Sequence, residues 1–121
     1  MKKILFIEDE EALQKVVKET LEKNGYDVFS ALDGKEGIKV AKIERPDLIL
    51  LDLILPQKDG FEVMKALKES PNTAAIPVIV LTNLEGSADI EKALSLGART
   101  YLVKSNYSLD DVLLKVKSVF G

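Results

Sequence analysis

The chain has 121 residues, the length of one ordinary domain, with 46% hydrophobic residues, 31% charged residues and a net charge of -3. This charge gives no general attraction for nucleic acid or anionic membranes, and the chain carries no membrane-spanning apolar stretch and no signal peptide. We therefore expect one domain over residues 1–121, located in the cytoplasm. The absence of cysteine and histidine excludes disulfides, thiolate chemistry, imidazole ligands and a phosphohistidine carried by this chain.

Five short apolar runs, each bounded by polar, glycine or proline residues, predict five β-strands. In chain order they are Ile4–Ile7, Val28–Ala31, Leu48–Leu51, Val78–Leu81 and Tyr101–Val103. The stretches after these runs have apolar residues at helical spacing, and each such set predicts one buried helix face. The sets are Leu13, Val16, Val17 and Leu21; Ile38 and Ala41; Phe61, Met64 and Leu67; Ile90, Ala93 and Leu94; and Leu109, Val112, Leu113 and Val116.

The regular alternation of strands and helices predicts an α/β fold. Asn24-Gly25 and Gly97 suit helix C-termini, and Ser108 with Asp111 forms a capping-box pattern. Near-continuous apolar strands are typical of a parallel sheet with helices on both faces. We predict a flavodoxin-like, doubly wound sheet of five parallel strands in the order 2-1-3-4-5, with five helices. In this topology, ligands bind beyond the carboxyl ends of the first and third strands.

Three acidic residues follow these two strands. Asp52 comes directly after Leu48–Leu51, and Glu8 and Asp9 come directly after Ile4–Ile7. Adjacent strands lie about 4.8 Å apart, so side chains just past both ends can share one ion. A site made only of carboxylate oxygens suits a hard cation such as Mg²⁺, completed by water and a phosphate.

Two further polar residues should face the same edge of the sheet. Thr82 follows Val78–Leu81 and offers a hydroxyl, and Lys104 follows Tyr101–Val103 and offers a positive charge. Together with the metal, the ammonium neutralises phosphoryl oxygens, while an ionised aspartate attacks without needing a general base. Asp52 is the best candidate for this nucleophile.

With these residues the chain resembles a response-regulator receiver domain of bacterial two-component signalling, in particular the single-domain chemotaxis regulators. The features that carry the resemblance, in chain order, are the acidic pair Glu8-Asp9, the phosphoacceptor Asp52, the Pro-x-x-x-Gly turn from Pro56 to Gly60, the switch hydroxyl Thr82, the switch aromatic Tyr101 and the lysine Lys104. The resemblance implies a phosphoacceptor rather than an ordinary enzyme. A sensor histidine kinase or a histidine phosphotransfer protein would donate the phosphoryl group.

The resemblance also assigns ligands for Mg²⁺. Asp9 and Asp52 would bind the ion directly, Glu8 would bind directly or through water, and the backbone carbonyl of Ile54 would complete the protein ligands. Glu8 stands where an aspartate is more common, and its extra methylene favours the water-mediated contact.

A switch between two conformations is the third implication. Lys104 would pair with Asp52 before phosphorylation and with the phosphoryl group afterwards. Thr82 would then move toward the phosphoryl group and let Tyr101 turn from outward to inward. This rotation would change the face formed by the fourth helix, fifth strand and fifth helix, which would regulate a downstream protein partner.

The chain departs from the family pattern at several positions. Ser105 follows Lys104 where a cis-proline is usual; because a cis bond before serine costs about 3 to 4 kcal/mol, we predict a trans or strained turn and a less firmly placed lysine. Asn83 would narrow access to the phosphoryl site or contact the phosphoryl group. Ile54 and Leu84 cannot align a hydrolytic water, which predicts slow dephosphorylation.

Alternatives stay open at this point. A pseudo-receiver would bind partners without phosphorylation. A Mg²⁺-dependent phosphohydrolase would want a second aspartate where Ile54 stands, and a flavin-binding module would place its phosphate against Glu8 to Glu11. We expect a single-domain regulator, a monomer or weak homodimer, with no direct binding to nucleic acid or membrane. The cognate kinase and the pathway are not readable from the residues.

Overall fold

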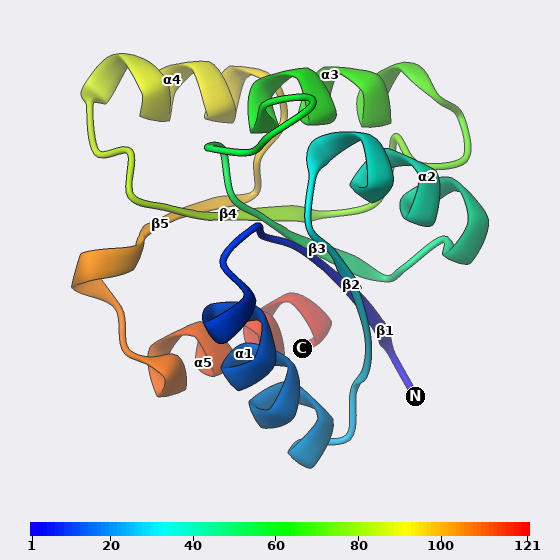
Figure 1. Ribbon diagram of the computed structural model, residues 1–121, viewed down its shortest axis with the longest axis vertical. Helices are drawn as coiled ribbons and strands as arrows, with labels where there is room; N and C mark the ends of the chain where they lie inside the picture. The colour runs from blue at the N-terminus through cyan, green and yellow to red at the C-terminus, as the bar shows by residue number, and fades with distance from the viewer.

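The computed structural model describes residues 1–121 and contains one parallel sheet between two layers of helices (Figure 1). The strands are β1 (Lys3–Ile7), β2 (Asp27–Ala31), β3 (Leu48–Leu51), β4 (Val78–Thr82) and β5 (Thr100–Val103). The helices are α1 (Glu11–Lys23), α2 (Gly34–Glu44), α3 (Gly60–Glu69), α4 (Ser87–Ser95) and α5 (Leu109–Phe120), with a 3₁₀ turn, η1, at Lys104–Asn106. All five predicted strands and all five predicted helices are confirmed.

The strand order is β2-β1-β3-β4-β5, as predicted, and every neighbouring pair is parallel. Helices α2, α3 and α4 cover one face of the sheet, and α1 and α5 cover the other (Figure 1). The placement of the helices on two faces follows from right-handed crossovers. From β1 the chain continues to β2 at one edge of the sheet, and from β3 it continues through β4 to β5 at the other edge. The order therefore reverses between β1 and β3, which lie side by side in the middle of the sheet.

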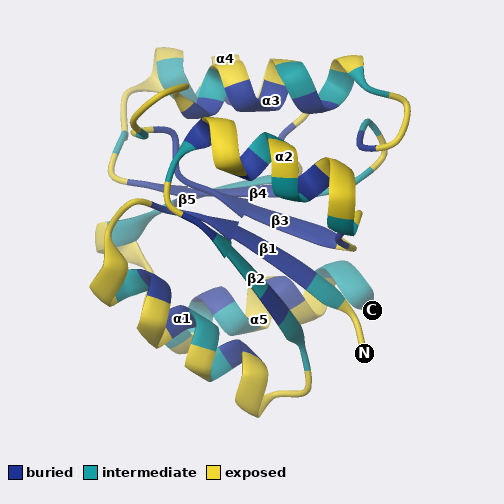
Figure 2. Ribbon diagram, turned by 45° about the vertical axis from the view of Figure 1, so that its right-hand side comes forward, coloured by how far each residue is buried: buried dark blue, intermediate teal, exposed yellow.

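The core has two halves because side chains alternate along each strand. Leu5 and Ile49 point toward α2 and α3, while Phe6 and Leu50 point toward α1 and α5. All four are fully buried, and β1 and β3 are buried along their length except at Lys3, the first residue of β1 (Figure 2). Each such side chain contributes roughly 1.5 to 3 kcal/mol to stability. The central strands therefore hold their carboxyl ends rigidly in place.

The helix ends follow the sequence signals. Gly25 and Gly97 have φ angles of 89° and 103°, and they lie just past α1 and α4. Left-handed backbone of this kind ends a helix without a side-chain clash. The capping box between Ser108 and Asp111 is present at the start of α5. No helix here combines the length and the hydrophobicity that a bilayer crossing requires.

Two residues that we predicted to lie on buried helix faces are exposed. Val16 is 46% exposed and Leu94 is 48% exposed. Val16 directly precedes the buried Val17 in α1, and Leu94 directly follows the buried Ala93 in α4. One position turns a helix by about 100°, so the adjacent residue lies at the border of the covered face. The predicted apolar stripes were too wide at these two places.

Candidate functional site

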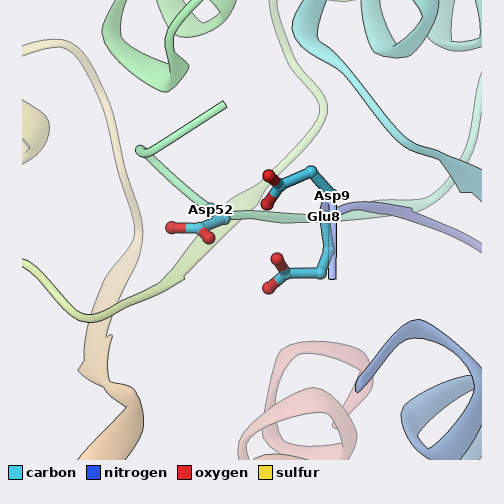
Figure 3. A group of neighbouring side chains, drawn as sticks. All are labelled: Glu8, Asp9 and Asp52. Carbon is cyan, nitrogen blue, oxygen red and sulfur yellow. The ribbon is translucent and has the colours of Figure 1, made fainter. Parts of the chain in front are cut away.

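The three acidic residues meet at the carboxyl ends of the central strands. Ile7 of β1 pairs with Leu51 of β3, so Glu8 and Asp52 each come one residue beyond this pair. One carboxylate oxygen from each of Glu8, Asp9 and Asp52 lies within 4.8 Å of the others. Figure 3 shows the carboxylates of Glu8 and Asp9 on the side of β1 that faces Asp52. The predicted cluster is therefore present.

The three carboxylates differ in their surroundings. Glu8 is fully buried and Asp52 is 3% exposed, whereas Asp9 is exposed. The Glu8 Oε2 accepts a hydrogen bond from the Glu10 N–H at 3.1 Å, and the Asp52 Oδ1 accepts one from the Ile54 N–H at 3.2 Å. These backbone donors fix the direction of the two buried carboxylates.

Lys104 supplies the positive charge and reaches both buried carboxylates. Its Nζ lies 3.1 Å from the Asp52 Oδ2 and 2.6 Å from the Glu8 Oε1. The contact with Asp52 was expected, and the contact with Glu8 was not. The Glu8 Oε1 therefore has the Lys104 ammonium as its close partner. The chain has no cis peptide bond, so Ser105 follows in the trans form that we predicted, within η1.

Burial and charge act against each other in this cluster. Burial raises the pKa of Glu8 to about 7, with the Asp52 charge adding to the rise, and Lys104 offsets only part of it. Burial lowers the pKa of Lys104, but its contacts with Glu8 and Asp52 outweigh burial and leave that pKa above its usual value. Ionisation of Glu8 is therefore unfavourable in the metal-free cluster despite the nearby lysine.

A metal ion fits this donor set. The oxygens come from carboxylates alone, and one from each of the three acids lies within 4.8 Å of the others. Hard divalent cations prefer such oxygens, and a positive ion relieves the repulsion between neighbouring carboxylates. An acidic cluster that could hold Mg²⁺ is thus present at the predicted edge of the sheet.

Thr82 and Tyr101, the predicted switch residues, both contact the backbone of Leu84. Thr82 ends β4 fully buried, and its Oγ1 accepts a long contact of 3.5 Å from the Leu84 N–H. The Tyr101 hydroxyl donates to the Leu84 carbonyl at 2.7 Å, and its ring packs against the core. Burial raises the pKa of this tyrosine, with Asp89 and Asp52 adding to the rise. Tyr101 therefore lies inward, tied to the residue two positions after Thr82, whereas we expected it to point outward before phosphorylation.

The remaining predicted residues surround the mouth of the site. Ile54 is 52% exposed, Asn83 is exposed and Leu84 is half-buried. The turn from Pro56 to Gly60 passes from β3 to α3, and a Cβ on Gly60 would lie 2.5 Å from the Leu53 Cα. Only glycine fits so close to a neighbouring backbone. This turn therefore keeps the segment after Asp52 compact.

One residue near the site was missed by the sequence reasoning. Gln14 of α1 is 5% exposed, and its Nε2 lies within hydrogen-bond distance of the Phe6, Glu8 and Ala31 carbonyl oxygens. A signal for it exists, because position 14 shares a helix face with Val17 and Leu21. A polar residue on an apolar face needs a partner.

Comparisons with known proteins agree with this geometry. A family model described as the response regulator receiver domain matches residues 4–117. The alkaline phosphatase synthesis transcriptional regulatory protein PhoP of Bacillus subtilis is 41% identical over 118 residues, which cover 98% of this chain and 48% of PhoP. The chain spans about half the length of the curated relatives that it matches first.

Solved structures resemble the whole chain. The chemotaxis protein CheY4 of Vibrio cholerae superimposes with a TM-score of 0.91 at 29% identity, over 98% of each chain. The Mn²⁺-bound form of the response regulator Rcp1 superimposes with a TM-score of 0.80 at 33% identity, covering 98% of this chain and 91% of Rcp1. The flavodoxin-like fold and the arrangement of the five strands are thus shared with CheY-like receiver domains.

Proposed function

Since the chain belongs to the response regulator receiver domain family of two-component systems, we propose that it is a switch activated by phosphorylation of Asp52. One observation carries the proposal: a nearly buried aspartate lies 3.1 Å from a lysine and beside two further acids. Burying a charged group costs stability unless it is paired, and one lysine faces three acids here. We treat residues 1–121 as one receiver domain.

Asp52 acts as the nucleophile in this proposal. One carboxylate oxygen attacks the phosphorus of a phosphohistidine or a small phosphodonor, the bond from phosphorus to the donor breaks, and the donor leaves with its electron pair. Lys104 starts from its contact with Asp52 and can hold a phosphoryl oxygen as negative charge moves there. Its second contact, with Glu8, keeps the ammonium at the site throughout.

Glu8, Asp9 and Asp52 would hold the Mg²⁺ ion, with the backbone carbonyl of Ile54 as a further ligand. When bound, the ion neutralises phosphoryl oxygens and the carboxylates that repel them. The all-oxygen donor set and the closeness of the three carboxylates support this assignment. The Mn²⁺ bound to the related Rcp1 is consistent with a divalent ion in this family.

The switch would use Thr82 and Tyr101. A hydrogen bond from the Thr82 hydroxyl to a phosphoryl oxygen would shift Thr82 relative to the Leu84 N–H, and Leu84 also carries the carbonyl that accepts from Tyr101. The two switch residues are thereby coupled through Leu84, and the face of α4, β5 and α5 would respond. Tyr101 already lies inward without a phosphoryl group, so phosphorylation would act on an inward tyrosine through its contact with Leu84.

Dephosphorylation would be slow. Ile54 presents an exposed aliphatic side chain and Leu84 a half-buried one, and neither orients a water for in-line attack. Asn83 is exposed, and its amide would contact or restrict the phosphoryl group. The signal would therefore be long-lived.

The partners proposed are a sensor histidine kinase or histidine phosphotransfer protein as donor, and a protein target for the switched face. PhoP and RpaA are transcriptional regulators. Identifying the proteins that bind this chain would test whether it also acts on transcription. A monomer or weak homodimer and a cytoplasmic location stay predictions.

The decisive experiment is phosphorylation followed by intact mass measurement. Incubation with Mg²⁺ and acetyl phosphate should add about 80 Da, the mass of one phosphoryl group, to the wild type and nothing to Asp52→Asn. Omitting Mg²⁺ should abolish the gain. A folded wild type that gains no mass would instead favour the pseudo-receiver, which binds partners without phosphorylation.

A further inference from the structure

The carboxylate of Asp9 has no partner of its own. Asp9 is exposed, and the three ion pairs of the molecule join Lys3 to Glu44 and Lys104 to Glu8 and Asp52. The direction of its side chain therefore depends on the backbone that carries it. Two peptide planes flank its Cα, and both are rigid units.

Both of these planes are held by side chains. The plane between Asp9 and Glu10 is held by its N–H, which donates to the Glu8 Oε2 at 3.1 Å. The plane between Glu8 and Asp9 is held by its carbonyl, which accepts from the Gln14 Nε2 at 3.2 Å. Fixing both planes fixes the φ and ψ angles of Asp9, and hence the direction of its Cβ.

Gln14 anchors this plane to the rest of the sheet. Its Nε2 also lies 2.8 Å from the carbonyl oxygen of Phe6, one residue before the end of β1, and 2.9 Å from that of Ala31, which ends β2. The two N–H groups of the amide are therefore shared among three carbonyl oxygens. The Ala31 carbonyl in addition accepts from the Glu8 N–H at 3.0 Å. One amide thus links the C-terminal parts of β1 and β2 to the segment between β1 and α1.

Burying this amide costs free energy, which indicates that its N–H groups have a specific structural role. Gln14 is 5% exposed on the same face of α1 as Val17 and Leu21, and its own Oε1 has no hydrogen-bond donor. A methionine would fill the same space without leaving a buried oxygen unpaired. What methionine cannot do is hold three carbonyl oxygens.

We propose that Gln14 is a positioning residue for the acidic site: its amide holds the Glu8–Asp9 peptide and thereby aims the Asp9 carboxylate at the metal. The proposal rests on the function proposed above. Residues that orient a metal ligand without touching the metal typically change its affinity ten- to a hundredfold, so the effect is of order ten-fold or more.

The test measures Mn²⁺ affinity, using the electron paramagnetic resonance signal of the free ion, in Gln14→Met and in a control. Thr73→Val is the matched control, since Thr73 is 1% exposed and its Oγ1 donates to the Leu67 carbonyl at 2.7 Å. It lies in the segment before β4, at the opposite edge of the sheet. Both variants lose a buried donor to a backbone carbonyl.

We expect Gln14→Met to raise the Mn²⁺ Kd about ten-fold and to speed exchange of the Glu10 amide hydrogen, while Thr73→Val leaves both at wild-type values. An unchanged Kd in a folded Gln14→Met overturns the proposal. Equal rises in both variants also overturn it, because general loss of stability would then explain them. If Gln14→Met does not fold, Gln14→Leu, which also removes the N–H donors, replaces it, and a wild-type Kd there overturns the proposal as well.

The wild type separates this proposal from the one on which it rests. If the wild type neither binds Mn²⁺ nor gains a phosphoryl group, the proposed function fails and the role of Gln14 fails with it. If the wild type does both and the Gln14 variant keeps its affinity, only the role of Gln14 fails.

Discussion

Replacing Glu8 by glutamine should remove a pH-dependent loss of stability from the metal-free protein. The pKa of Glu8 is about 7 in the folded chain, compared with an ordinary value of 4.5. The folded state therefore binds this proton more tightly than the unfolded state does. The stabilisation that comes from binding this proton is complete below pH 4.5 and is lost as the pH rises through about 7.

The magnitude follows from the size of the shift. A difference of one pKa unit corresponds to about 1.4 kcal/mol, so Glu8 should cost the wild type about 3 kcal/mol between the acidic and the alkaline limit. Glutamine has nearly the same shape and does not titrate. The free energy of unfolding of Glu8→Gln, minus that of the wild type, should rise by this amount across the window.

The assay is urea unfolding of both proteins at a series of pH values with a chelator present, and far-ultraviolet circular dichroism monitors the loss of structure. Parallel pH profiles for the two proteins would refute the reasoning, as would a wild type that gains stability relative to Glu8→Gln as the pH rises. Addition of Mg²⁺ provides an internal check. Because the ion binds ionised carboxylates, its stabilising effect on the wild type should grow with pH across the same window.

Three further predictions concern residues around the site. Ile54→Asn combined with Leu84→Glu should shorten the half-life of phospho-Asp52, measured by the decay of the phosphorylated mass; a wild-type half-life of seconds would contradict slow dephosphorylation. Tyr101→Phe removes the hydrogen bond to the Leu84 carbonyl and should lower the free energy of unfolding by about 1 kcal/mol in urea titrations, and no change would argue against that bond. Gly34→Ala places a Cβ against the Lys58 carbonyl oxygen and should cost roughly 1 to 3 kcal/mol by the same measurement, and wild-type stability would mean that the segment around Lys58 moves freely.

Much of the site was predictable because the carboxyl ends of parallel strands meet at one edge. Residues that directly follow a buried strand must lie at that edge, whatever the details of packing. This rule placed Asp52 beside Glu8 and Asp9, and it brought Lys104 to the same place from β5. The family resemblance added roles to these positions, and those roles stay proposals.

Periodicity was less informative about the borders of the helix faces. Val16 and Leu94 belong to apolar sets with helical spacing, yet both are exposed. How far a neighbouring element covers a helix depends on where that element packs. The spacing of apolar residues along one helix carries no information about its neighbour.

The sequence by itself determined the strand and helix order, the parallel sheet and the location of the acidic cluster, because these depend on local patterns and on chain connectivity. Only the tertiary structure decided that Lys104 also pairs with Glu8, that Leu84 joins Thr82 to Tyr101, and that Gln14 holds the ends of β1 and β2. Each of these contacts joins groups whose distance and direction are set by packing. A hydrogen bond requires both to be correct within a few tenths of an ångström and a few tens of degrees, which no pattern along the chain specifies.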